Sequence, residues 1–188
     1  MRLVWDGNVP LHEWTALEVG ADNVDEVVTW LFEEDSFVPA AKLTAGGSYS
    51  IVTDHLGAPS QMHDETGELL WAAQIDGFGA VRFSRGKSQD CPFRYQGQYE
   101  DVETGLYYNR FRYYEPSSGQ YISQDPLRLE GGNPNAYAYV SDCNVEIDPL
   151  GLKECKIWRK AKKDYWKSKH SSEVAALLEN VLQPIWLV

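Results

Sequence analysis

The sequence predicts a mainly β protein of consecutive antiparallel hairpins, followed by a short helical C-terminal tail. Three observations lead to this class. Acidic turns that end in Gly recur along the chain, and each is followed by residues that favour a half-buried strand. Nine of the eleven tyrosines lie between Tyr95 and Tyr139, where their rings can cover a sheet while their hydroxyls stay hydrogen-bonded. Beyond residue 152, apolar residues adopt a helical spacing instead.

The hairpins follow from the turns, taken in chain order. The clearest turns are residues 64–67, 101–105 and 115–119, which precede the strand-like runs 68–71, 106–108 and 120–122. Gly at the end of a turn accepts the positive φ that a hairpin corner needs. This imperfect repetition predicts a repeat architecture, and residues 85–92 are expected to form an exposed loop between strands.

The tail, residues 153–188, is expected to be helical. Its basic start, from Cys155 to Lys167, is typical of a first helix, and Ser171 or Ser172 can cap a second one that ends before Pro184. The second helix would carry one apolar stripe at helical spacing, formed by Val174, Leu177, Leu178, Val181 and Leu182. So short a segment, without a metal or a disulfide, is not expected to be a stable enzyme.

Charge divides the chain at the same place. The net charge of −11 combines −15 for residues 1–152, with 9 Lys and Arg against 24 Asp and Glu, and +4 for residues 153–188, with 8 against 4. An acidic surface of this kind makes nucleic acid an unlikely partner for the first part. The basic tail either binds nucleic acid or docks on the acidic part, and docking is the simpler reading.

Several classes of protein are not expected. The N-terminus has no apolar segment typical of a signal peptide, and no run is long enough to span a bilayer. We therefore expect a cytoplasmic location in the producing cell, or export by a route that needs no cleaved signal. The three cysteines are too scattered for a disulfide framework or a zinc site. His55 and His63 are read as turn and packing residues, so we expect no metal and no cofactor.

The most informative residues lie between Arg112 and Leu152. Two Asp-Pro steps occur here, and the second, at Asp148, opens the pentapeptide Asp-Pro-Leu-Gly-Leu directly before the change in charge. Together with the repeated hairpins and the spacing of Arg112, Asp125 and Asp148, this resembles the C-terminal end of the Rhs/YD-repeat core. In that family, hairpins wind into a hollow shell around a toxin, and a variable tip follows the pentapeptide.

The resemblance implies three regions. Residues 1–94 would be degenerate YD-repeat hairpins, residues 95–152 the Rhs-associated core, and residues 153–188 a truncated variable tip. About 150 residues are too few for a whole shell, so the chain is expected to be the last piece of one. Its partners would be upstream Rhs repeats, the spike protein of a type VI secretion system or an immunity protein. The resemblance thus implies a role in competition between bacteria.

The resemblance also implies a self-cleavage site. Asp125 and Asp148 fall on the family's aspartyl-protease-like pair, Arg112 falls on its assisting arginine, and the bond expected to break joins Leu152 to Lys153. The chemistry is reasonable, because two carboxylates held close together do not both ionise cheaply, so one can act as acid and the other as base. A guanidinium can hold such a carboxylate in place.

The implied function is therefore a shell fragment that shields its C-terminal tip and releases it by one self-cleavage after Leu152. Two alternatives stay open. The chain can be an inert structural remnant that neither cuts nor kills, or the tail can be an intact toxin acting on nucleic acid. There is one departure from the family: Cys143 stands where the family usually has Pro, which can loosen the approach of Asp148 and slow cutting.

Overall fold

The computed structural model describes residues 2–14, 16–18, 21–22, 27–128, 134–152 and 155–156. They belong to one compact unit that extends from Met1 to Lys156. The helices expected within residues 153–188 lie outside the described residues, apart from the two residues of strand β16 (Cys155–Lys156). The basic helix expected to begin at Cys155 is therefore wrong at its first two positions, where the chain pairs with a strand instead.

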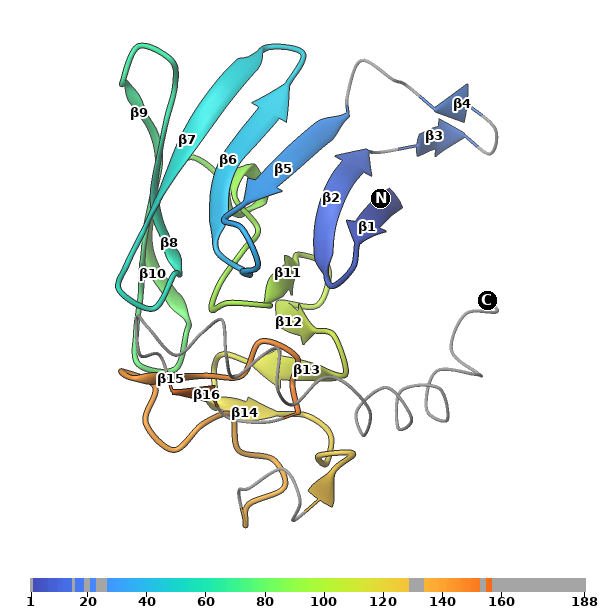
Figure 1. Cartoon of the computed structure of the whole chain (residues 1–188), viewed down its shortest axis with the longest axis vertical. Helices are drawn as coiled ribbons and strands as arrows, with labels where there is room; N and C mark the ends of the chain where they lie inside the picture. The colour runs from blue at the N-terminus through green and yellow to red at the C-terminus, as the bar shows by residue number, and fades with distance from the viewer. Residues whose placement is uncertain are drawn as a thin grey trace. The chain divides into compact units, whose positions relative to one another are not determined.

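An eight-stranded antiparallel sheet forms the first part of the chain (Figure 1). Its strands follow the order β1-β2-β5-β6-β7-β8-β9-β10, so each strand pairs with the next strand of the sheet along the chain. They are β1 (Arg2–Asp6), β2 (Val9–Trp14), β5 (Val28–Phe32), β6 (Pro39–Thr44), β7 (Gly47–Thr53), β8 (Pro59–His63), β9 (Leu69–Ile75) and β10 (Val81–Arg85). The short strands β3 (Ala16–Glu18) and β4 (Ala21–Asp22) pair separately.

One turn design repeats along this sheet. Asp54, Asp64 and Asp76 each begin a hairpin turn and accept backbone N–H bonds on Oδ1 from the residues two and four positions later, at 2.8–3.0 Å. The Gly three positions after each Asp has a φ between +81° and +85°. An Asx turn closed by a left-handed Gly fixes both the corner and the register of the strands that follow.

The core lies on one face of the large sheet. Trp30, Ile51, Met62 and Trp71 point to this face, since side chains alternate along each strand. The chain after β10 crosses it, and Cys91, Phe93 and Tyr99 complete the cluster; the ring of Phe93 meets that of Trp30 edge to face at 4.8 Å between centroids. The exposed loop expected at residues 85–92 is thus wrong at its end, where Cys91 and Pro92 are buried.

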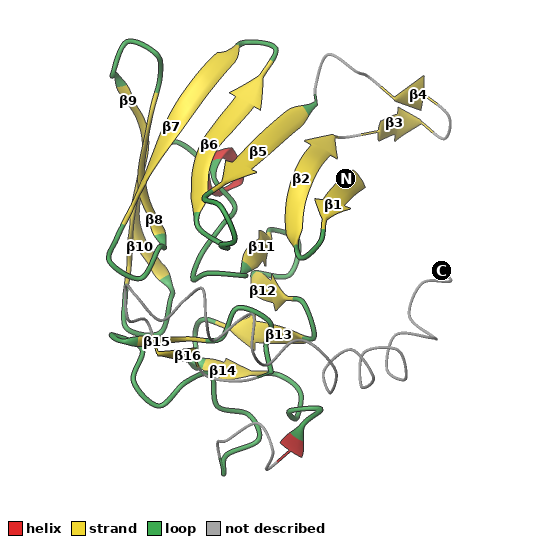
Figure 2. Cartoon of the chain, viewed as in Figure 1, coloured by secondary structure: helices red, strands yellow, loops and turns green. Residues whose placement is uncertain are grey.

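A second, four-stranded antiparallel sheet follows (Figure 2). It contains β11 (Tyr99–Asp101), β12 (Leu106–Asn109), β13 (Arg112–Glu115) and β14 (Gln120–Tyr121). Strand β15 (Glu146–Ile147) pairs with β16. Among the described residues the helical content is limited to short 3-10 turns such as η2 (Ser88–Asp90). The mainly antiparallel β class predicted from the sequence is confirmed.

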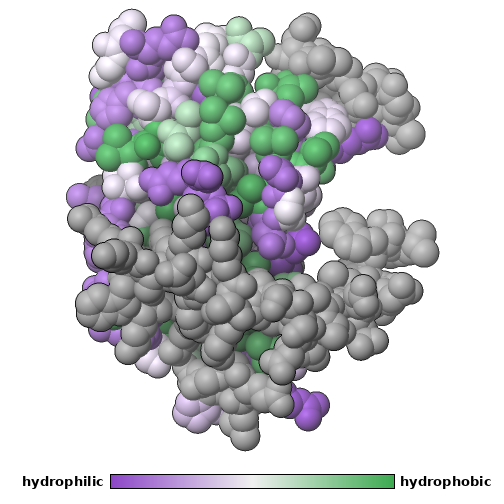
Figure 3. Space-filling model, viewed as in Figure 1, coloured by the Kyte–Doolittle hydropathy of each residue, from purple (hydrophilic) through white to green (hydrophobic). Residues whose placement is uncertain are grey.

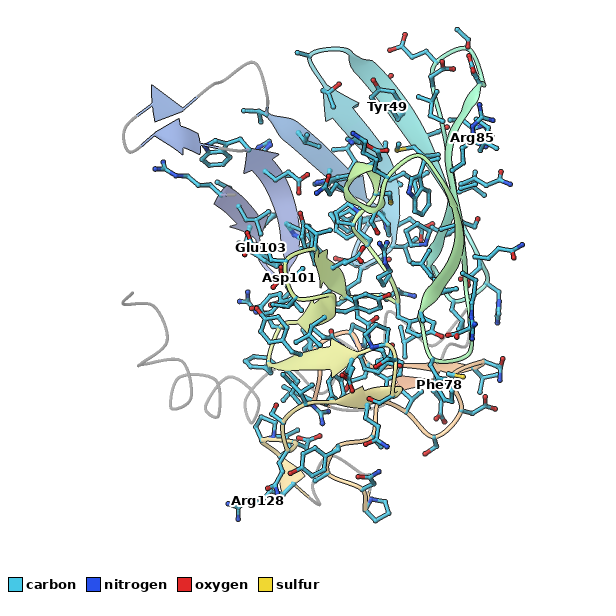
Figure 4. The ribbon with its side chains drawn as sticks, turned by 180° about the vertical axis from the view of Figure 1, so that it is seen from behind. Tyr49, Phe78, Arg85, Asp101, Glu103 and Arg128 are labelled. Atoms are coloured by element: carbon cyan, nitrogen blue, oxygen red, sulfur yellow. The ribbon has the colours of Figure 1, made fainter. Side chains whose placement is uncertain are left out.

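Tyrosine hydroxyls join the two sheets at the turn between β9 and β10. Tyr95, Tyr107 and Tyr114 donate to the backbone carbonyls of Asp76, Gly79 and Phe78, at 3.1, 3.0 and 2.5 Å. The side chain of Phe78, labelled in Figure 4, lies against Gly119 in the turn between β13 and β14. Burial raises the pKa of all three tyrosines, so they stay protonated and able to donate. This contact fixes the small sheet against the large one.

Some apolar surface remains on the large sheet, among polar residues (Figure 3). Leu31, Leu43 and Val52 are exposed by 42%, 36% and 46%. Leu31 and Val52 directly follow the core residues Trp30 and Ile51, so they point to the opposite face. Among the described residues, no helix has the length and apolar character needed to cross a membrane.

Candidate functional site

The turn between β12 and β13 presents an arginine to the end of the described chain. Asn109 and Arg112 form a register pair, and the two residues between them make the turn, with Arg110 at a φ of +54°. Arg112 is only 4% exposed, and its guanidinium lies 3.6 Å from the centre of the Tyr121 ring. A buried guanidinium needs partners for its charge and its N–H groups.

The charge of Arg112 is matched by the two predicted aspartates. Its Nη2 lies 3.0 Å from Oδ2 of Asp125 and 3.3 Å from Oδ2 of Asp148. The same nitrogen atom therefore contacts one oxygen of each carboxylate, so the two carboxylates lie close together. The structure therefore brings Arg112, Asp125 and Asp148 together, with the guanidinium contacting both carboxylates where we expected it beside one.

Asp125 follows β14 and begins a turn of its own. Its Oδ1 accepts the N–H of Leu127 at 2.7 Å, and its own N–H donates to the carbonyl of Ala136 at 2.8 Å. Burial raises the pKa of the Asp125 carboxyl above its ordinary value, although the Leu127 N–H and the Arg112 charge act in the opposite direction. Asp125 therefore keeps a proton to higher pH than an exposed aspartate does.

Asp148 is more deeply buried, at 1% exposure. Its Oδ1 accepts the N–H of Leu152 at 2.9 Å, and its Oδ2 accepts the hydroxyl of Tyr121 at 3.0 Å. Burial raises the pKa of Tyr121 well above the usual value, as it does for Tyr139, which lies against the Asp148 backbone. Both tyrosines are thus neutral, and the donors around Asp148 suit a charged carboxylate.

Residues of the β12–β13 turn donate hydrogen bonds to the backbone carbonyls of the segment 148–152. The Asn109 side-chain amide donates to the carbonyl of Asp148 at 2.9 Å, and the Phe111 N–H donates to that of Leu150 at 3.3 Å. Arg112 Nε donates to the carbonyl of Gly151 at 2.5 Å. All five residues of the segment are buried. The peptide before the expected cleavage point is therefore fixed by backbone contacts.

Two glycines allow this close approach. A Cβ built on Gly97, whose φ is +85°, would overlap the carbonyl oxygen of Pro149. A Cβ on Gly151, at a φ of +72°, would lie 2.6 Å from the carbonyl oxygen of Asn109. Only a residue without a side chain fits at either place.

Sequence reasoning missed Asn109, Tyr121 and Gly97. Their contacts cross long stretches of chain, and none of them stands out from many similar residues. Cys143, which departs from the family pattern, is half-buried in a turn closed by Asp142. Lys153, on the far side of the expected cleavage point, lies outside the described residues. Within the described part of the chain, no three His, Cys, Asp or Glu side chains gather as ligands for a metal ion.

Comparison with known proteins finds relatives among YD-shell and Rhs toxin proteins. The family model described as the Teneurin YD-shell matches residues 19–136. The toxin protein Tse5 of Pseudomonas aeruginosa is 49% identical over 119 residues, which are 61% of this chain and 9% of that protein. The probable deoxyribonuclease RhsB of Dickeya dadantii is 34% identical over 130 residues, 67% of this chain and 9% of that protein. The chain thus spans less than a tenth of these relatives.

The fold matches solved structures as well. The crystal structure of TcdB2-TccC3 without its hypervariable C-terminal region aligns with a TM-score of 0.57 and 22% identity. The alignment covers 67% of this chain and 6% of that one. At this identity the likeness supports the fold alone.

Proposed function

The chain belongs to the Teneurin YD-shell family and is a fragment of an Rhs/YD-repeat protein, and on that basis we propose that it cuts itself once, between Leu152 and Lys153. The observation that carries this proposal is the convergence of two carboxylates on one guanidinium close to Leu152. Asp148, one of the two, accepts the N–H of Leu152 itself, which supports a cut after this residue. The cut would free the variable tip from its shell.

The proposed reaction is hydrolysis by a water molecule. The charged carboxylate of Asp148 takes a proton from water as the oxygen attacks the carbonyl carbon of Leu152. Asp125, whose raised pKa favours the protonated form, donates its proton so that the nitrogen of Lys153 leaves as an amine. The products are a carboxylate on Leu152 and a free amino group on Lys153. Arg112 keeps the two carboxyl groups in place and offsets their charge.

Placement within one chain supplies much of what a protease obtains by binding a substrate. The segment 148–152 is already held by the β12–β13 turn, so no entropy of association opposes the reaction. A single turnover suffices. The upstream Rhs repeats, a spike protein and an immunity protein remain proposed partners. Among the described residues β1 is the end strand of the large sheet, and further antiparallel strands would add at this end.

The first prediction concerns the products. Freshly synthesised protein is expected to separate into two pieces, and sequencing of the smaller one is expected to begin at Lys153. Intact-mass spectrometry combined with N-terminal sequencing makes this measurement. A chain that stays whole while circular dichroism shows a folded β core would contradict self-cleavage and favour the inert remnant.

The second prediction concerns pH. The carboxyl of Asp125 has a raised pKa and donates a proton in the proposed reaction, so the rate of cutting should fall as pH rises through that pKa. Time courses of cell-free synthesis at a series of pH values that begins near the ordinary pKa of an aspartate measure this decline. A rate that increases steadily over the whole series would show that Asp125 does not act as the acid.

A further inference from the structure

Asn109 lies at the centre of the site although it carries no charge. It ends strand β12 directly across from Arg112 and is 0% exposed. Its side-chain nitrogen donates two hydrogen bonds, one to the backbone carbonyl of Asp148 at 2.9 Å and one to the hydroxyl of Tyr121 at 2.7 Å. An amide nitrogen has two hydrogens, and both are therefore in use.

The second of these bonds leads on to the Asp148 carboxylate. The Tyr121 hydroxyl accepts a hydrogen bond from the Asn109 amide and donates its own hydrogen to Oδ2 of Asp148, at 3.0 Å. Asn109 thus contacts Asp148 twice, directly at its backbone and through Tyr121 at its side chain. Hydrogen bonds in such a chain polarise and strengthen one another in a buried setting.

The oxygen of the same amide indicates why the residue is an asparagine. Within the described residues, Oδ1 of Asn109 is buried without a hydrogen-bond partner. A buried acceptor left in this state destabilises a fold, and an apolar side chain of equal size would avoid the cost. Packing therefore does not explain why this residue is an asparagine. The two hydrogen bonds that its side-chain NH2 group donates do.

We propose that Asn109 is a positioning residue for self-cleavage: it holds the backbone and, through Tyr121, the carboxylate of Asp148 at the distance the reaction needs. The inference rests on the proposed function, since positioning has meaning only if the Leu152–Lys153 bond is cut. It adds Asn109 and Tyr121, two neutral residues, to the three charged ones.

The test replaces Asn109 by the isosteric leucine. Leucine removes the unpartnered Oδ1 but also takes away a donor from the buried carbonyl of Asp148, so the melting temperature of Asn109→Leu is expected to change little. Its cutting in cell-free synthesis is expected to be about 10- to 100-fold slower, as with misplaced reacting groups.

A matched pair of variants separates the site from the core. Tyr121→Phe removes the hydroxyl on Asp148 and should slow cutting, whereas Tyr114→Phe removes the hydroxyl of a similarly buried tyrosine, which donates to Phe78, and should not. Equal rates for Asn109→Leu and wild type, or equal losses in Tyr121→Phe and Tyr114→Phe, would overturn the positioning role.

A second measurement does not depend on cutting. In the Asp125→Asn chain, hydrogen exchange of the backbone amides of residues 148 and 150–152 is expected to rise about tenfold or more when Asn109→Leu is added, because the carbonyl of Asp148 loses its bond to Asn109. Unchanged exchange would contradict the positioning role even if the wild type cuts. Failure of the wild type to cut, with exchange raised as expected, would contradict the proposed function and leave the contact itself established.

Discussion

Asp125→Asn is expected to yield one uncut chain where the wild type yields two pieces. The variant keeps the shape of the side chain and its contact with Leu127 but has no acidic proton to donate. Removal of one acid-base group typically costs about 10²- to 10⁴-fold in rate. Intact-mass spectrometry over the hours after synthesis separates these outcomes, and the melting temperature shows whether the core still folds.

Asp148→Asn should also stop the cut, but at a larger cost to folding than Asp125→Asn, because Asp148 is the more deeply buried of the two. Asp148 is 1% exposed and accepts hydrogen bonds from Leu152, Tyr121 and Arg112. An amide nitrogen in its place would face some of these donors as another donor. Breaking a buried ion pair costs about 3–5 kcal/mol, partly offset here because Arg112 retains Asp125. Asp125→Asn is therefore the cleaner test.

A third substitution controls for the loss of a carboxylate nearby. Asp142→Asn removes an exposed carboxylate that closes the turn before β15 and lies outside the group around Arg112. This chain is expected to cut as the wild type does. If Asp125→Asn cuts at the wild-type rate, Asp125 is not the acid, and the contact of Arg112 with both aspartates has a structural role only.

The parts of the fold that the sequence predicts are those with local causes. The turns at Asp64 and Asp76 are closed by hydrogen bonds within four residues and by a left-handed Gly, and such patterns are visible in a few letters. The pairing of neighbouring strands follows from these turns. The burial of Cys91 was not predictable in this way, because it depends on a core built from distant strands.

In the candidate site, too, some residues have a signal in the sequence and others do not. Arg112, Asp125 and Asp148 were found through the fixed spacing of a family motif, and the structure shows that they converge. Asn109 and Tyr121 carry no comparable signal, since asparagine and tyrosine are common in hairpins. Their positions become meaningful only once the β12–β13 turn is seen to face residues 148–152.

Gly97→Ala is expected to stop cutting and to destabilise the core strongly. The new Cβ would overlap the carbonyl oxygen of Pro149, which is a backbone atom and cannot turn away as a side chain would. The segment 148–152 must then move away from the paired carboxylates, and a displacement of about 1 Å can cost about 100-fold in rate. The left-handed backbone at Gly97, with a φ of +85°, adds strain of about 1–2 kcal/mol for any residue with a Cβ.

Gly67→Ala separates these two contributions. Gly67 has the same φ of +85°, but a Cβ there would meet nothing within 4 Å. The control should therefore lose only the strain of about 1–2 kcal/mol and should cut at the wild-type rate as long as it stays folded. Urea unfolding and intact mass, measured on both variants, are the readouts. If Gly97→Ala behaves like Gly67→Ala in both, the 148–152 segment has room to shift, and the close contact of Gly97 with Pro149 does not hold the cleavage point in place.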